Sequence, residues 1–421
     1  MARVHTAFVG CKVSQADADA AQAALCGAGH QPAAPDEADL AVLVTCCVTA
    51  EAERKSRQLA HRLAAGGRPV IVTGCAAAYR PEQFAAPGLV VAAREELAAA
   101  AVALAPKGSR GQPGAGERAE GRTGTHAAFS SAERRRTRLT LKVQDGCSSA
   151  CSYCAVRLAR GPLWSLPLGE ARRAAQAGIA GGCGEIVLSG INVGLYQDGD
   201  GATLADLVTA LAALPGLGRL RLSSVEPQHL GPSLLAALAH PRVARHVHAP
   251  LQSADDEVLA AMRRPYTFAE YLERLDAARA AMGEIMVSTD IMVGFPTEDE
   301  AAFARTLAAL GSGRFGRVHL FPYSRRPGTA VAALRPLPPD LVRARRAAAL
   351  RAAEAARAAA ARAEVGSVAE VLVEDRADGH WRGYTSRYTR CYVGAAALEP
   401  GALVEVTVEE TYRDGVRGSL A

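Results

Sequence analysis

The first hundred residues of the chain alternate between short apolar runs and longer stretches with helical spacing. Runs such as VHTAFV (4–9) and LAVLVT (40–45) are unbroken and rich in β-branched residues, and an alanine-rich helical stretch follows each of them. Strands and helices that alternate with tight connections are typical of a parallel sheet covered on both faces. The pattern therefore predicts an N-terminal parallel α/β domain over residues 1–105.

A second alternating series begins near Leu139, and helical stretches such as 168–180 and 268–282 separate its apolar runs. Its candidate strands are 139–143, 185–190, 220–224, 247–251, 285–293 and 317–321. Six strand–helix units are fewer than the eight of a closed barrel, so this series predicts an open or partial barrel.

Three other segments complete the predicted organisation of an α/β protein. Residues 106–136 are rich in Gly, Arg and Glu and predict a flexible linker. A long Ala/Arg-rich helix is expected over about 339–364, at the end of a central domain that spans 137–364. The tail, 365–421, contains short strand-like runs separated by turns, which favours a small β-barrel.

Composition narrows the class of protein only modestly. The chain has 421 residues, of which 49% are apolar and 22% charged, and this is typical of a globular protein with two or three domains. No apolar run is long enough to predict a membrane span, and the N-terminus does not resemble a secretory signal. A net charge of +5 permits a nucleic-acid partner without requiring one. Ten cysteines without an export signal predict a reducing compartment, the cytoplasm, where clustered cysteines are metal ligands or catalytic thiols.

The segment DGCSSACSYC contains the first candidate metal site. Cys147, Cys151 and Cys154 begin just after the first strand of the predicted barrel. Function in parallel α/β sheets lies at the carboxyl ends of strands, so this loop is well placed to hold an inorganic centre. A four-iron cluster held by three cysteines would keep one iron open to a substrate or cofactor. The alternative is a structural zinc ion with a distant fourth ligand.

Three other cysteines occupy a repeated position. Cys11, Cys46 and Cys75 each follow a predicted strand of the N-terminal domain. If these strands are neighbours, their thiols meet at one edge of the sheet and form a second site with three thiolates. The alternative is three unrelated buried cysteines, since cysteine is a common core residue. Cys47 is expected to point elsewhere, and the others are interpreted as packing residues: Cys26, Cys183 and Cys391.

These motifs together resemble the methylthiotransferases of the radical S-adenosylmethionine superfamily. The resemblance covers nearly the whole chain and rests on GCKVSQADADA, TCCVTAEAERKSRQ, VTGCAA, LKVQDGCSSACSYCAVRLARG, RLSSVEP, TDIMVGFPTE and FPYSRRPGTAV. It implies an N-terminal domain with an auxiliary [4Fe-4S] cluster, a radical barrel with a second [4Fe-4S] cluster, and a C-terminal TRAM domain. The implied cluster ligands are Cys11, Cys46 and Cys75 in the first domain and Cys147, Cys151 and Cys154 in the barrel.

The resemblance also implies a reaction. GCKV and DGCSSACSYC look most like the enzymes that convert N6-threonylcarbamoyladenosine, just 3′ of the tRNA anticodon, to its 2-methylthio derivative. The alternatives are methylthiolation of isopentenyladenosine in tRNA or of a ribosomal-protein aspartate, and a non-catalytic iron–sulfur protein that binds tRNA. The implied cofactors are two [4Fe-4S] clusters and S-adenosylmethionine. The implied partners are tRNA and an electron donor such as flavodoxin or ferredoxin, with a monomer as the expected state. Departures such as Ser14, Val44 and Arg157 remove no cluster ligand but alter their surroundings.

Further residues are weaker candidates. S-adenosylmethionine contacts are expected from Tyr153, next to the cofactor's adenine, from Glu226, on its ribose hydroxyls, and from Asn192 and Asp290. The alternatives are a surface aromatic, a solvated carboxylate, a turn residue and a structural hydrogen bond, respectively. The tail interleaves cations and aromatics in the way that RNA-binding surfaces do, although an amphipathic strand would show the same pattern. The expected RNA-binding residues are Arg382, Tyr384, Arg387, Tyr388 and Arg390.

Overall fold

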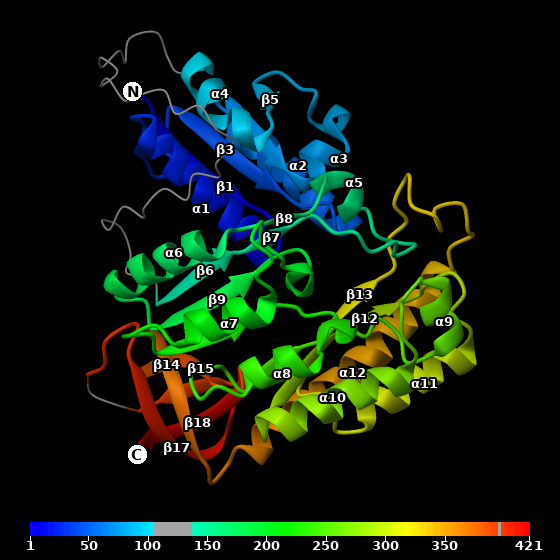
Figure 1. The fold of residues 1–421 in the computed structure, drawn as a ribbon. Coiled ribbons are helices and arrows are strands. Elements are labelled where there is room, and N and C mark those ends of the chain that lie inside the picture. Colours follow the sequence, from blue (N-terminus) through cyan, green and yellow to red (C-terminus); the bar gives the residue numbers. More distant parts are fainter. Residues whose placement is uncertain (105–136, 395–396) are drawn as a thin grey trace. The chain divides into compact units, whose positions relative to one another are not determined.

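The computed structural model describes residues 1–104, 137–394 and 397–421, so the predicted linker, 106–136, lies outside the described residues. The described chain divides into two compact units, which are presented separately (Figure 1). The first unit contains the N-terminal residues together with Gly146–Ser148 and Cys154–Pro162. The second contains Ser149–Tyr153 and Leu163–Ala421 with the strand that precedes them.

The first unit is built on a parallel sheet of five strands in the order β2-β1-β3-β4-β5. Its strands are β1 (Arg3–Phe8), β2 (Gln31–Pro32), β3 (Leu40–Thr45), β4 (Val70–Gly74) and β5 (Leu89–Val91). Its helices are α1 (Lys12–Gly27), α2 (Ala50–Ala64), α3 (Cys75–Tyr79), α4 (Leu97–Leu104) and α5 (Val156–Arg160). Every residue of β3 and β4 is buried, because apolar clusters pack on both faces of the sheet. The predicted parallel α/β domain is confirmed.

The second unit contains the six predicted parallel strands. They are β6 (Arg138–Lys142), β9 (Glu185–Ser189), β10 (Arg219–Leu222), β11 (His246–His248), β12 (Met286–Val293) and β13 (Arg317–Pro322). They form sheets in the orders β10-β9-β6 and β11-β12-β13, and parallel bridges from Leu220 to Val243 and from Ser224 to His248 join these sheets. The partial barrel is therefore confirmed. A short antiparallel pair, β7 (Gln144–Asp145) and β8 (Trp164–Ser165), flanks the cysteine loop.

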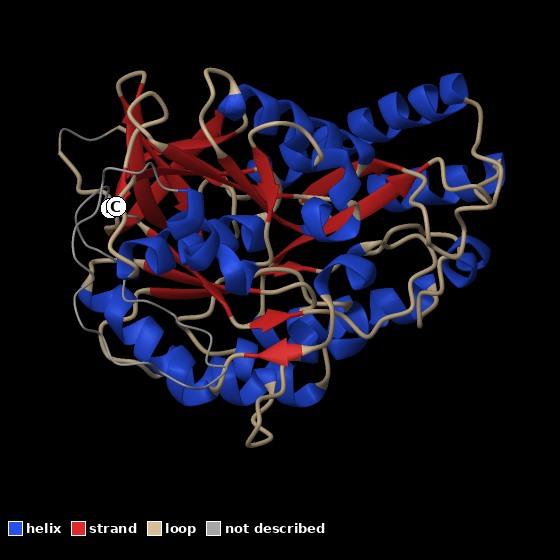
Figure 2. Ribbon diagram, turned by 90° about the horizontal axis from the view of Figure 1, so that it is seen from above, coloured by secondary structure: helices blue, strands red, loops and turns tan. Residues whose placement is uncertain are grey.

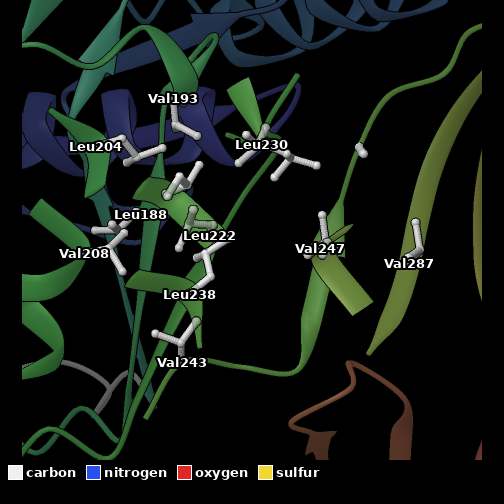
Figure 3. Close-up of a cluster of buried hydrophobic side chains, with 14 of the residues drawn as sticks. Leu188, Val193, Leu204, Val208, Leu222, Leu230, Leu238, Val243, Val247 and Val287 are labelled. Carbon is white, nitrogen blue, oxygen red and sulfur yellow. The ribbon is translucent and has the colours of Figure 1, made fainter. Parts of the chain in front are cut away.

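Helices separate these strands along the chain, and they include the three that the sequence predicts at 168–180, 268–282 and about 339–364. Figure 2 shows the helices in blue and the strands in red. They are α6 (Leu168–Ala180), α7 (Leu204–Ala212), α8 (Pro232–Leu238), α9 (Asp256–Ala261), α10 (Phe268–Met282), α11 (Glu300–Gly311) and α12 (Pro339–Ala363). Figure 3 shows part of the core, where Leu188 and Leu222 of the strands meet Val208 and Leu238 of the helices. None of the helices in the described residues is long and apolar enough to cross a membrane.

The tail forms the predicted small barrel, closed in the order β14-β15-β16-β18-β17. Its strands are β14 (Val368–Ala377), β15 (His380–Thr385), β16 (Arg390–Val393), β17 (Leu403–Tyr412) and β18 (Gly415–Leu420). Buried charges join this barrel to the six-stranded one within the second unit. Glu185 pairs with Arg138, Arg219 and Arg221, and the last two donate to the carbonyl oxygens of Tyr384 and Thr385, at 3.1 and 3.2 Å.

Candidate functional site

The first unit brings three of the predicted ligands to one edge of its sheet. Cys11, Cys46 and Cys75 follow β1, β3 and β4, which are adjacent parallel strands whose carboxyl ends lie side by side. Cys11 is exposed at the start of α1, whereas Cys46 and Cys75 are only 4% and 3% exposed. The prediction that these strands are neighbours is therefore confirmed, and the strand order alone places the three cysteines at that edge.

Two glycines allow the backbone to reach this arrangement. Gly10 and Gly74 directly precede Cys11 and Cys75, and their φ angles are +133° and +90°. A Cβ atom on Gly10 would lie 2.8 Å from Cys46 Cβ, and one on Gly74 would lie 2.7 Å from the backbone nitrogen of Thr45. Both positions therefore require glycine, for the conformation and for the space. The GC dipeptide at each position is a structural element of the site.

The electrostatic environments of the two buried thiols differ. Burial raises the pKa of Cys46 to about 12, and nearby Cys75 and Cys11 add to this effect. A hydrogen bond from Cys47 lowers the pKa of Cys75 to about 6 against the effect of burial, and the positive charge of Arg160 helps. Our expectation that Cys47 points elsewhere is wrong, because its side chain makes this hydrogen bond to Cys75. The hydrogen bond and the nearby cation thus both favour the thiolate form of Cys75, which is the form that binds metals.

The three thiols are near neighbours at the sheet edge. Cys75 and Cys11 both raise the pKa of Cys46, so the thiols lie close enough to influence one another's ionisation. Three thiolates at one edge are the number that can hold a four-iron cluster with one iron left open, whereas a closed structural zinc site takes four ligands.

The cysteine loop after β7 contains the other three predicted ligands. Gly146, with a φ of +73°, precedes Cys147, and a Cβ atom there would lie 2.3 Å from the carbonyl oxygen of Pro162. Cys147 and Cys154 belong to the first unit and Cys151 to the second. Next to Cys151, Ser152 donates its backbone N–H to Met262 and its hydroxyl to Ala261, at 3.0 and 2.7 Å. These bonds fix the middle of the loop on the C-terminal end of α9.

A buried arginine connects Cys151 with the predicted ribose ligand Glu226. Arg264 is 8% exposed and pairs with both carboxylate oxygens of Glu226, which follows β10. The same guanidinium donates to Cys151 Sγ at 3.4 Å, and its Nε donates to the Tyr266 hydroxyl at 2.8 Å. Burial opposes the charge on Arg264, but Glu226 raises its pKa well above the ordinary value. Glu226 is therefore held in place beside Cys151, a predicted cluster ligand.

Other predicted cofactor contacts lie at the carboxyl ends of the barrel strands. Asn192, just after β9, is 4% exposed, and its side-chain amide has no hydrogen-bond partner among the described residues. The buried hydroxyls of Ser189 and Ser223, at the ends of β9 and β10, also lack partners there. Buried polar groups of this kind mark a place for a polar ligand. Tyr153 packs edge-on against Phe295, at 6.4 Å between ring centroids, in a small apolar cluster.

Asp290 lies in the middle of β12 with a histidine on each neighbouring strand. His248 Nε2 and His319 Nδ1 are 3.3 and 3.2 Å from the same carboxylate oxygen of Asp290. Although burial opposes ionisation, these two hydrogen bonds hold the pKa of Asp290 below its usual range. Ser288 fixes the other nitrogen of His248 at 2.8 Å. The three side chains therefore form a hydrogen-bonded polar group inside the partial barrel.

The tail residues predicted to bind RNA do not share one open surface. The rings of Tyr384 and Tyr388 stack at 5.0 Å, and arginines of the partial barrel cover them. Arg138 lies 5.0 Å from the centroid of Tyr384, and Arg221 lies 4.6 Å from that of Tyr388. Of the remaining three, Arg390 lies over the Tyr384 ring and donates to its hydroxyl. Arg382 pairs with Asp375, and Arg387 is half-buried near Glu364.

Sequence reasoning missed four polar residues near the predicted ligands. Arg160, Arg264, His248 and His319 are distant in sequence from the predicted ligands that they contact. Arg160 lies near the end of the motif LKVQDGCSSACSYCAVRLARG, and His248 and His319 lie within the predicted strands 247–251 and 317–321. Only the tertiary structure shows which side chains these residues meet.

Comparisons with known proteins agree with this architecture. Residues 3–93 match the family described as uncharacterized protein family UPF0004, residues 141–310 the radical SAM superfamily, and residues 362–421 the TRAM domain. A tRNA-2-methylthio-N(6)-dimethylallyladenosine synthase from Anaeromyxobacter dehalogenans is 34% identical and covers 99% of this chain and 94% of its own. The threonylcarbamoyladenosine tRNA methylthiotransferase MtaB from Thermotoga maritima is 33% identical over 78% of this chain and 76% of its own.

A further relative and a solved structure extend the picture. The threonylcarbamoyladenosine tRNA methylthiotransferase MtaB from Bacillus subtilis is 30% identical over 97% of this chain and 94% of its own. Among solved structures, the radical S-adenosylmethionine methyltransferase TsrM from Kitasatospora setae has a TM-score of 0.57 over 79% of this chain and 77% of its own. At 17% identity, that likeness supports the fold alone.

Proposed function

Because the chain belongs to the methylthiotransferases of the radical S-adenosylmethionine superfamily, we propose that it converts N6-threonylcarbamoyladenosine in tRNA to its 2-methylthio derivative. It is an enzyme that transfers a methylthio group, and its family uses S-adenosylmethionine and two [4Fe-4S] clusters. The GCKV and DGCSSACSYC motifs favour the threonylcarbamoyl substrate. The identity of 34% over 99% of the chain to a dimethylallyladenosine enzyme supports the second candidate, the dimethylallyl base.

The observation that carries the proposal is the presence of two cysteine trios in different surroundings. In the proposal, Cys11, Cys46 and Cys75 hold the cluster that provides sulfur, at the edge of the first sheet. Cys147, Cys151 and Cys154 hold the cluster that binds S-adenosylmethionine. This cofactor supplies radical chemistry, which the unreactive adenine C2–H requires and ordinary acid–base side chains cannot provide.

The remaining polar residues bind and orient in this proposal. Glu226, held by Arg264, would accept hydrogen bonds from ribose hydroxyls, and Asn192 would donate to or accept from the cofactor's polar edges. Tyr153 would present its ring to the adenine, while Asp290 would fix the two histidines that line the barrel. Their shared task is to hold the reacting groups in one orientation, because correct placement supplies much of the rate acceleration in such reactions.

We propose further that residues 382–390 of the tail contact tRNA. The arginines at 382, 387 and 390 suit phosphate oxygens, since guanidinium groups match their geometry. Tyr384 and Tyr388 would hold this segment against the partial barrel, given the arginines that cover their rings. The RNA-binding segment would then move with the catalytic barrel as one body.

Mass spectrometry of modified nucleosides tests the proposed substrate. A strain without the gene should lose 2-methylthio-N6-threonylcarbamoyladenosine from its tRNA, and the wild-type gene should restore it while the Cys147→Ala variant should not. Loss of the dimethylallyl derivative instead would assign the second candidate. If both tRNA nucleosides persist and a ribosomal peptide loses its methylthio group, a protein substrate replaces the RNA.

A further inference from the structure

One charged side chain is buried directly against a proposed cluster ligand. Arg160, the last residue of α5, has a side chain that is fully buried. Its Nε donates to Cys75 Sγ at 2.9 Å, and its Nη1 donates to Asp17 of α1 at 2.7 Å. All three residues belong to the first unit. A guanidinium in this position gives Cys75 both a hydrogen bond and a full positive charge.

A buried carboxylate holds Arg160 beside Cys75. The side chain of Asp17 is 3% exposed and is shared by Arg160 and by Arg94, whose Nη2 is 3.4 Å away. A buried charge is stable only when it is paired, and Asp17 is one such partner of Arg160. The Nε–H of Arg160 meanwhile faces Cys75 Sγ, to which it donates.

The origin of Arg160 in the sequence links the two cysteine sites. It lies six residues after Cys154, in the motif that contains the other cysteine trio. The segment Cys154–Pro162, which contains α5, packs within the first unit, and Ala159 joins the apolar cluster around Cys75 and Phe84. The same segment thus contains one ligand of the radical cluster and the cation at the auxiliary site.

We propose that Arg160 is a positioning residue that raises the reduction potential of the cluster held by Cys11, Cys46 and Cys75, an inference that rests on the proposed function. Uptake of one electron makes a cluster and its thiolates more negative. Hydrogen bonds and positive charge at the ligand sulfur stabilise that reduced state. Arg160 supplies both, and Asp17 holds it in the orientation that does so.

A redox titration followed by electron paramagnetic resonance tests this role. It is done on the full chain with Cys147→Ala, which removes the signal of the other cluster. Arg160→Gln should shift the reduction potential of the cluster at Cys11, Cys46 and Cys75 to a more negative value. Arg160→Lys keeps the charge but loses the planar guanidinium that donates to both Cys75 and Asp17, so it should shift this potential less. The control Arg54→Gln removes an exposed arginine of the same unit and should leave the potential unchanged.

Asp17→Asn provides the opposite sign. Asparagine keeps an oxygen that can accept from Nη1 of Arg160, so this variant removes the negative charge while Arg160 stays oriented toward Cys75. The potential should then shift to a more positive value, which a purely structural role would not predict. If Arg160→Gln loses its iron, the reduction potentials of Arg160→Lys and Asp17→Asn show whether the charge beside Cys75 sets the potential of the cluster. An unchanged potential in the iron-loaded variants would overturn the proposal and leave the proposed function intact. Failure of the parent protein to form any cluster at this site would overturn both.

Discussion

The two predicted cluster sites are built on different kinds of scaffold. Cys11, Cys46 and Cys75 come from three neighbouring strand ends, separated by dozens of residues, and two of the thiols are buried. Cys147, Cys151 and Cys154 lie within eight residues of one loop, and each is half-buried. The first site depends on the order of strands in a sheet, whereas the second depends on the conformation of a single loop.

Both sites nevertheless contain the same accessory arrangement. A buried arginine donates to one cysteine in each: Arg160 to Cys75 at 2.9 Å and Arg264 to Cys151 at 3.4 Å. A carboxylate holds each arginine, Asp17 in the first case and Glu226 in the second. A fixed cation beside one predicted ligand is thus common to both sites, although their backbones are unrelated. Because Arg160 is closer to its sulfur than Arg264 is, we expect the arginine to affect the cluster potential more at the strand-end site.

The largest effect should follow from removing one ligand from each site. Cys147→Ala should abolish the reductive cleavage of S-adenosylmethionine and lose about one cluster's worth of iron. Cys46→Ala should lose a similar amount of iron but keep the cleavage, because the radical site retains its three thiolates. Iron and sulfide counting after anaerobic reconstitution, together with a 5′-deoxyadenosine assay, measures both quantities.

The proposed difference between the two sites is contradicted if Cys46→Ala loses the cleavage of S-adenosylmethionine as Cys147→Ala does. Loss of both clusters in Cys46→Ala would show that the loop site cannot form without the strand-end site. Cys26→Ala is a matched control, because this half-buried cysteine lies near the end of α1, at the opposite end of the helix from Cys11. It should keep the full iron content.

The strand-end site was largely predictable because strand periodicity is a local signal. The apolar runs before Cys11, Cys46 and Cys75 fixed the strands, and parallel topology then brought their ends together. The roles of Cys47 and Arg160 could not be predicted, since no local pattern specifies which side chain meets Cys75 across two strands. The same limit applies to Asp290, whose histidine partners come from strands dozens of residues away. The tail barrel was predicted from its turns, but the cover over Tyr388 depends on tertiary packing.

Glycine substitutions should produce an intermediate effect that separates backbone strain from crowding. Gly10→Ala places a methyl group 2.8 Å from Cys46 Cβ at a φ of +133°, so it should cost about 1–3 kcal/mol of unfolding free energy and reduce iron loading at the strand-end site. Gly29→Ala has a φ of +88° with no atom within 4 Å, so it carries strain alone and should cost less. Hydrogen exchange of β1 and β3 amides in the cluster-free protein measures the difference. Equal costs would mean that the contact with Cys46 is unimportant.

The smallest effect should come from replacing Arg264. This substitution allows a direct comparison of the two arginines, Arg264 beside Cys151 and Arg160 beside Cys75. Arg264→Gln, in a Cys46→Ala background, should shift the potential of the loop cluster to a more negative value, because a cation near Cys151 is lost. The shift should be smaller than that of Arg160→Gln at the other site. The donor lies 0.5 Å farther from the sulfur (3.4 against 2.9 Å), and Glu226 takes both terminal nitrogens of Arg264 whereas Asp17 takes one from Arg160. Arg343→Gln, at an exposed position on α12, is the control for lost charge in the same unit. A shift at Arg264 equal to or larger than that at Arg160 would show that distance to the sulfur does not rank the two arginines, and that the carboxylate partner or the surroundings of the loop matter more.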